Sequence, residues 1–134
     1  MTKEDWAKVQ EALSGLYKTV RLNVDGYNVA LQLRMATAYK NVIAIYVNDV
    51  FKGEWMLNDC EERRCFVQKR EKSFYSPKEK ERLNKVSKKM LKELKINIEA
   101  KFEYYQNHWS SFGALKKHLI ANNKEITLVS IGIE

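Results

Sequence analysis

The sequence predicts an α+β protein: an N-terminal helix, an antiparallel sheet of about four to six strands, and helices packed on one face of that sheet. Three observations carry this prediction. Apolar residues at helical spacing open the chain, and two alternating apolar runs then meet at an Asp-Gly pair. Helical spacing returns twice in the second half, where it alternates with strand-like runs.

Length and composition limit the class of protein. The chain has 134 residues, of which 45% are hydrophobic and 31% charged, with a single Pro. These values are typical of a folded chain with one core, so we expect a single domain over residues 1–134. No apolar run approaches the roughly 18 residues of a transmembrane helix, and the first residues lack the apolar segment of a signal peptide. We therefore expect a cytoplasmic protein that does not enter a membrane.

The first half of the chain is expected to form one helix and four strands. Trp6, Val9, Leu13 and Leu16 have helical spacing within residues 3–17, and Ser14-Gly15 indicates where this helix ends. The alternation over residues 19–33 predicts a hairpin that turns at Asp25-Gly26. The β-branched run 41–47 favours a central strand, and residues 50–56 are expected to be the next strand.

The second half is expected to contain five elements. In order, they are a short helix through Cys65 capped by Asn58 or Asp59, a helix that begins at Ser76, a strand over residues 96–105 that returns to the sheet, a helix capped by Ser110 or Ser111 that ends at Asn122-Asn123, and an edge strand over residues 126–131.

Positive charge is concentrated in one stretch. Residues 69–95 contain eleven of the 24 Lys and Arg but only four of the 17 Asp and Glu, so this stretch has a net charge of +7 and the remainder is balanced. Any interaction that depends on basicity therefore involves this stretch.

The helix from Ser76 is predicted to be amphipathic. Ser76 is a suitable N-cap and Pro77 a suitable first residue, and Leu83, Val86, Met90 and Leu94 form a stripe that should pack on the core. A second stripe consists of five cations: Lys78, Arg82, Lys85, Lys89 and Lys92. This stripe is either a solvated face or a track for a polyanion such as nucleic acid or an acidic protein surface.

Aromatic residues add a second candidate for binding. Six of them lie near or within the charged stretch and its return: Trp55, Phe74, Tyr75, Tyr104, Tyr105 and Trp109. Exposed aromatics stack on bases or anchor protein partners, although packing in the core is their commoner role. Tyr75 and Tyr105 are possible anchors. Neighbouring residues of a strand cannot both point inward, so at least one of Tyr104 and Tyr105 is expected to be exposed or to cover a helix.

Catalytic and metal sites have weak support in the sequence. Glu99-Ala100-Lys101 is similar to the Glu-x-Lys element of metal-dependent nucleases, but only Asp49 or Asp59 is left to supply the further carboxylate, and alternating charge on a solvated strand explains the pattern equally well. The two Cys and two His have spacings that do not suit zinc, and the glycines are too isolated for a phosphate loop. We expect no enzyme, no metal and no cofactor.

Several phrases together resemble a family of small uncharacterised proteins encoded by tailed phages and prophages. They are Asp25-Gly-Tyr, Tyr46-Val-Asn, Phe51-Lys-Gly-Glu-Trp-Met, Asp59-Cys-Glu-Glu-Arg-Arg, Tyr75-Ser-Pro-Lys-Glu and Trp109-Ser-Ser-Phe-Gly-Ala-Leu-Lys-Lys-His-Leu-Ile-Ala-Asn-Asn. The resemblance spans most of the chain and implies expression in a bacterial cytoplasm. It brings no catalytic residues. Small proteins in that setting are often antagonists of host defence or accessories in DNA handling.

Two classes of function follow, with a third behind them. The first is a phage-encoded binding protein that inhibits a host defence or regulatory complex by stoichiometric binding, as anti-CRISPR proteins do; its partner would be a host protein or ribonucleoprotein. The second is weakly specific binding of DNA or RNA, in which the five cations contact phosphates. The third is a metal-dependent nuclease.

Overall fold

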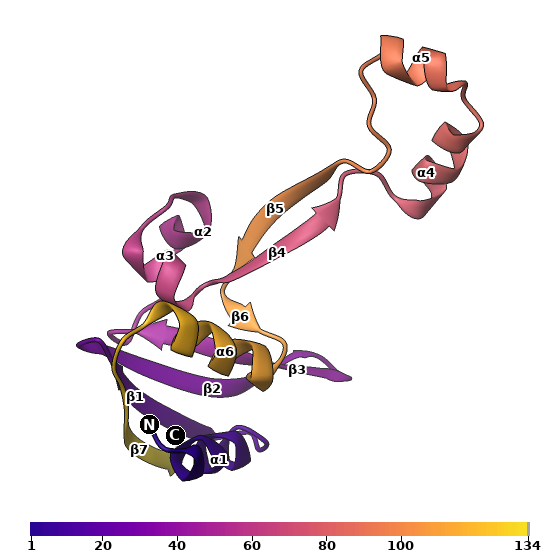
Figure 1. The fold of residues 1–134 in the computed structure, drawn as a ribbon. Coiled ribbons are helices and arrows are strands. Elements are labelled where there is room, and N and C mark those ends of the chain that lie inside the picture. Colours follow the sequence, from indigo (N-terminus) through magenta and orange to yellow (C-terminus); the bar gives the residue numbers. More distant parts are fainter. Residues whose placement is uncertain (134) are drawn as a thin grey trace. The chain divides into compact units, whose positions relative to one another are not determined.

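The structure, a computed structural model, describes residues 1–133 and has the predicted α+β architecture. The chain divides into two compact units (Figure 1). Unit 1 contains Met1–Gln68 and Tyr105–Glu134, and unit 2 contains Lys69–Tyr104. Within residues 1–133, no helix is both long and apolar enough to span a bilayer.

Unit 1 is built on a five-stranded antiparallel sheet. Its strands, in the spatial order β6-β3-β2-β1-β7, are β6 (His108–Trp109), β3 (Lys40–Val47), β2 (Tyr27–Thr37), β1 (Lys18–Val24) and β7 (Ile126–Ile133). The predicted edge strand is confirmed as β7, which pairs with β1.

The first hairpin forms where the sequence places it. Val24 pairs with Tyr27, and Asp25 and Gly26 between them have φ values of 48° and 90°. Positive φ at both central residues is the requirement of a type I′ turn, which Asp-Gly satisfies at low steric cost.

Asp25 also joins this turn to the start of β7. Its carboxylate accepts hydrogen bonds from the backbone amides of Lys124 at 2.9 Å and Glu125 at 2.8 Å, and its own amide donates to the Glu125 carbonyl at 2.9 Å. Both bonds lower the pKa of Asp25 below its ordinary value of 3.8, and the bond from Lys124 has the larger effect.

Three helices cover one face of this sheet, as predicted. They are α1 (Lys3–Ala12), α3 (Glu61–Phe66) and α6 (Phe112–Asn122). Trp6 and Val9 of α1, Phe66 of α3, and Leu115 and Leu119 of α6 are buried. They form one cluster with the inward residues of the strands, among them Val20, Leu22, Val24, Val29, Leu31, Ile43, Ile45 and Val47. On the opposite face, the Gln32 amide donates to the Thr19 hydroxyl at 3.0 Å.

Helices α1 and α6 both begin at a side-chain cap, but the first helix is shorter than predicted. Thr2 and Asp5 form a reciprocal capping box at the start of α1, and Ser111 caps α6 through the amide of Ala114. The opening helix ends at Ala12 rather than near residue 17, because Ser14 and Gly15 turn the chain and Tyr17 adopts a φ of 71°.

The prediction of a strand over residues 50–56 is wrong. Asn48 and Asp49 both have positive φ and turn the chain so tightly that Val50 makes only an isolated bridge with Val47. A short helix, α2 (Glu54–Leu57), follows, and it places Trp55 in the core edge-on to the Phe51 ring at a centroid distance of 5.0 Å. Burial of this large side chain therefore outweighs the strand propensity of the segment.

The short helix through Cys65 is confirmed as α3, with a different cap. Cys60 occupies the N-cap position, and Asp59 instead forms an ion pair with Arg64. The Cys65 thiol lies in the core, where burial raises its pKa.

Unit 2 contains two short helices and most of a two-stranded ribbon, whose ends belong to unit 1. They are β4 (Gln68–Ser73), β5 (Lys101–Gln106), α4 (Pro77–Asn84) and α5 (Lys88–Glu93). The predicted strand over residues 96–105 begins later, at Lys101, because residues 97–100 form a turn in which the Asn97 side chain accepts from the Glu99 amide at 3.0 Å. It pairs with β4 and not with the main sheet, to which β6 returns the chain.

The hydrophobic core belongs to unit 1. Every residue of the buried cluster lies in that unit, whereas Leu91 is the one hydrophobic residue of unit 2 among the buried residues described. The expectation of one core is consistent with this distribution, and the single-domain expectation remains a prediction that unfolding experiments can test.

We predict that unit 1 folds without unit 2. Replacing residues 70–104 with Asn-Gly leaves Lys69 and Tyr105 joined by a hairpin turn and keeps every residue of the buried cluster. The shortened chain should unfold cooperatively within about 4–8 °C of the full chain, a shift that corresponds to about 1 kcal/mol. Circular dichroism measures this, with Phe66→Ala as a destabilised reference expected to cost about 3–5 kcal/mol. A chain that is unfolded after the excision would contradict the division of the core.

We also predict a pH-dependent contribution from Asp25. In Asp25→Asn the new amide side chain tolerates positive φ but accepts with one oxygen and carries no charge, so this variant should be less stable than wild type at pH 7. Because folding lowers the pKa of Asp25, its contribution is complete above the unfolded pKa of about 4 and is lost as the pH falls through the folded value. Urea unfolding midpoints of the two proteins should therefore converge between pH 7 and about pH 2.5. A difference that stays constant over this range would refute the assignment.

Candidate nucleic-acid interface

The positive charge of the protein is concentrated in unit 2. Its 36 residues contain twelve Lys and Arg and six Glu, a net charge of +6, whereas the rest of the chain has a net charge of +1. The charge is thus separated from the hydrophobic core.

The single helix predicted from Ser76 is wrong, because the structure divides it in two. Ser76 caps α4 as expected, since its hydroxyl accepts from the Glu79 amide at 3.2 Å and Pro77 follows as the first residue. Helix α4 ends at Asn84, and Ser87 then caps α5 through the Met90 amide at 3.2 Å. The Ser87 side chain competes with the helical ladder for a backbone amide, so it starts a new helix in place of continuing the old one.

The five predicted cations are all exposed but do not form one straight stripe. Lys78 and Arg82 lie on α4, Lys85 is its C-cap residue, and Lys89 and Lys92 lie on α5. The positive surface is therefore shared by two short helices and the turn between them.

The apolar stripe predicted for the same helix is also wrong. Leu91, which lies outside that stripe, is buried, while Met90 and Leu94 are 53% and 62% exposed and Leu83 and Val86 are half-buried. The break at Ser87 changes which side of the second helix points inward, since the helical phase is not carried across it.

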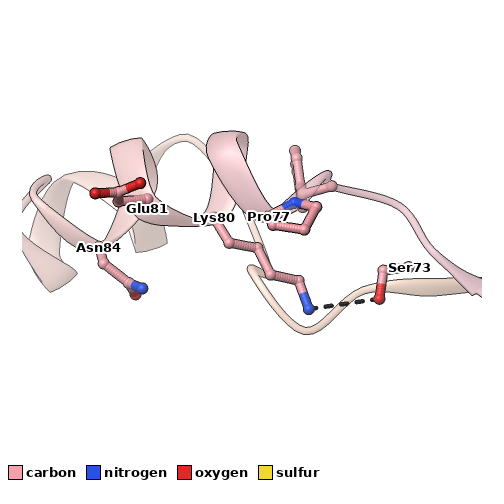
Figure 2. A pocket seen from close by; sticks show the side chains of 6 residues that line it. Ser73, Pro77, Lys80, Glu81 and Asn84 are labelled. Atoms are coloured by element: carbon pink, nitrogen blue, oxygen red, sulfur yellow. Dashed lines mark hydrogen bonds between the residues drawn. The ribbon is translucent and has the colours of Figure 1, made fainter.

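A hollow of about 380 Å³ lies beside α4 (Figure 2). It is lined by Ser73, Tyr75, Pro77, Lys80, Glu81 and Asn84. Figure 2 shows the Lys80 side chain directed at Ser73, with Nζ 3.4 Å from the hydroxyl oxygen, and Glu99 lies 4.0 Å from the same ammonium. Lys80 is only 28% exposed, so unlike the other cations of α4 it is held in place by polar neighbours.

The two faces of the β4–β5 ribbon differ in chemistry. The Gln106 amide donates to the Gln68 side-chain oxygen at 2.9 Å, so these two side chains share one face. Alternate residues of a strand share a face, so the same face also carries Arg70 and Lys72 from β4 and Phe102 and Tyr104 from β5. On the other face, Lys69 forms an ion pair with Glu103 at 3.0 Å.

The two predicted aromatic anchors are both half-buried. Tyr75 contacts Phe74 edge-on, with ring centroids 5.0 Å apart, and lines the hollow beside α4. Tyr105 packs against the core of unit 1, and the Arg63 guanidinium lies 3.4 Å from its ring centroid. One face of the Tyr105 ring is therefore already covered by a cation.

The remaining aromatics divide between core and surface. Trp55 and Trp109 are buried, and the Trp109 indole donates to the Phe66 carbonyl at 3.0 Å. Phe74 is 62% exposed and Phe102 is 44% exposed. Phe102 lies outside the six aromatics that the sequence singles out, although its spacing of two from Tyr104 on a predicted strand indicates that these two rings share a face.

Each candidate nuclease carboxylate lies near a different cation. Glu99 is 78% exposed and its carboxylate lies near Lys80, while Asp49 and Asp59 form ion pairs with Arg21 and Arg64 respectively. Across residues 1–133, no group of three or more His, Cys, Asp or Glu side chains is placed to hold a metal ion.

The cysteines and histidines are engaged separately. Cys60 and Cys65 are both free thiols. The His118 ring lies 2.9 Å from the Arg64 carbonyl through Nε2, and burial lowers its pKa. The His108 ring contacts the side chain of its neighbour Asn107.

Comparisons of this chain with protein-family models, with curated proteins and with solved structures found no match.

Proposed function

We propose that this chain is a binding protein without catalytic activity and that unit 2 contacts nucleic acid through its phosphates. The observation that carries the proposal is the separation of charge: unit 2 has a net charge of +6 on 36 residues, and the rest of the chain has +1. Neutralising phosphates with Lys and Arg releases the counterions around the nucleic acid, which drives binding without reading sequence.

The exposed cations suit this role. Lys78, Arg82, Lys85, Lys89 and Lys92 are all exposed on or beside α4 and α5. Side chains of this kind reach phosphates at little cost, because no buried ion pair has to be broken first. Contacts to phosphates position a protein on nucleic acid, so weak sequence preference is the expected behaviour.

A second candidate is the stoichiometric inhibitor of a host defence or regulatory complex in a bacterial cytoplasm. Two observations favour it. Met90 and Leu94 are exposed on the same unit as the cations, and apolar anchors are what a protein interface requires in addition to charge. The resemblance to phage and prophage proteins would place such an inhibitor in an infected bacterium, and the partner would be a host protein or ribonucleoprotein with an acidic surface.

Charge reversal on α4 and α5 tests the first candidate. Arg82→Glu, Lys85→Glu and Lys89→Glu together should keep the fold and weaken binding to any DNA sequence equally. The slope of log affinity against log salt should shrink by about 0.9 for each phosphate of duplex DNA that the variant no longer neutralises. Fluorescence anisotropy over a range of salt concentrations measures both quantities.

A matched control separates position from total charge. Lys8, Lys40 and Lys52 are exposed in unit 1, and their replacement by Glu changes the net charge by the same amount. This control should lose much less affinity than the unit 2 variant. Equal losses in the two variants, or no loss in either, would remove α4 and α5 from the interface.

Affinity capture tests the second candidate. The tagged chain, expressed in a bacterial host and treated with nuclease, should retain a host protein in a fixed ratio, and Met90→Ser with Leu94→Ser should abolish this retention while leaving thermal unfolding nearly unchanged. Leu57→Ser is the control, because Leu57 is 80% exposed in unit 1. Recovery of nucleic acid alone, with nothing retained after digestion, would leave the first candidate as the better account.

A further inference from the structure

One face of the β4–β5 ribbon combines two cations with two aromatic rings. Arg70 and Lys72 lie on this face with Phe102 and Tyr104, and the two rings have centroids 6.2 Å apart. We propose that this face binds single-stranded nucleic acid, with bases stacked on Phe102 and Tyr104 and the neighbouring phosphates bound by Arg70 and Lys72. The inference rests on the proposed nucleic-acid function and adds to it the form of nucleic acid and the residues that select it.

The contrast with the opposite face supports a specific role. That face carries Lys69, Glu71, Lys101 and Glu103, of which Lys69 and Glu103 are paired at 3.0 Å. Such balanced charge is typical of a solvated strand surface. The opposite face also carries Tyr105, but the Arg63 guanidinium already covers one face of that ring at 3.4 Å from its centroid. Among the described residues of β4 and β5, the aromatic face carries no carboxylate, so the ribbon itself does not repel a phosphate there.

The aromatic rings are available to a ligand. Phe102 is 44% exposed and Tyr104 is half-buried, and the rings are inclined at 46° to each other, so neither covers the other completely. A core role would have buried both rings. Residues two apart on a strand are separated by about 6.6 Å, a spacing at which successive unstacked bases can each meet a ring.

The same chemistry disfavours a duplex on this face. In double-stranded DNA the faces of the bases are stacked on one another, and only their edges are open in the grooves. Aromatic faces gain stacking energy only from bases that are already unstacked, as in a single strand. Cations alone would bind both forms, so it is Phe102 and Tyr104 that should make the difference between them.

Anisotropy with two labelled probes tests this inference on the full chain. The probes are a twelve-nucleotide thymidine strand and a twelve-base-pair duplex, at one salt concentration. Wild type should bind the single strand more tightly than the duplex. Phe102→Ala should weaken single-strand binding by about 5- to 150-fold, the range that corresponds to about 1–3 kcal/mol of stacking per base, and should change duplex binding by less than about two-fold.

Two further variants guard against loss of structure. Phe102→Leu keeps an apolar side chain on the ribbon while removing the ring, and it should show the same selective loss with an unchanged unfolding temperature. Tyr39→Ala is the aromatic control, because Tyr39 is fully exposed in unit 1, and it should bind both probes as wild type does.

The outcomes separate this inference from the proposed function. If charge reversal on α4 and α5 weakens binding to both probes while Phe102→Ala and Phe102→Leu weaken neither, unit 2 binds nucleic acid but not by stacking, and the inference fails. Tighter binding of the duplex than of the single strand would overturn it in the same way. If wild type binds neither probe, the proposed function fails as well.

Discussion

The fold depends on hydrogen bonds between the residues just before and just after the segment Lys69–Tyr104, which forms unit 2. The Trp109 indole donates a buried hydrogen bond to the Phe66 carbonyl at 3.0 Å, and the Gln106 amide donates to Gln68 at 2.9 Å. These bonds join residues 43 and 38 positions apart, immediately before the chain leaves unit 1 and immediately after it returns. Because a buried N–H left without an acceptor is costly, the Trp109 bond fixes the return of the chain as well as stabilising it.

Because these bonds hold the two ends of the segment, unit 2 can form without a hydrophobic core of its own. Among its described residues, Leu91 is the one buried hydrophobic side chain, and its helices α4 and α5 are too short to be stable as isolated peptides. Their stability must come from caps such as Ser76 and Ser87 and from the ribbon that carries them. Most side chains of this unit therefore lie at the surface, among them the exposed cations of α4 and α5.

This division explains why the two candidate functions use the same unit. Cations attract any polyanion, whereas exposed apolar and aromatic side chains decide which polyanion is held. On the ribbon, Phe102 and Tyr104 offer flat faces that suit bases. On and just after α5, Met90 and Leu94 offer flexible aliphatic surface that suits a protein. On this account, nucleic acid and an acidic ribonucleoprotein would be distinguished by the apolar side chains that each contacts, and not by the charge.

The sequence by itself determined the features that depend on neighbouring residues. Asp25-Gly26 specifies its turn through backbone conformation, Ser111 and Thr2 specify helix starts through short-range hydrogen bonds, and the charge of unit 2 is a matter of composition. The break at Ser87 also depends on a neighbouring hydrogen bond, but the helical spacing of the apolar residues on both sides predicted one continuous helix.

Only the tertiary structure decided the features that depend on pairing between distant residues. Residues 50–56 do not form a strand, because the short helix α2 buries Trp55 in the core. Phe102 becomes part of a candidate site because β5 pairs with β4 and not with the main sheet. A strand alternates its side chains with a period of two, so the sequence shows which residues share a face, but the partner strand across the ribbon determines what else that face contains.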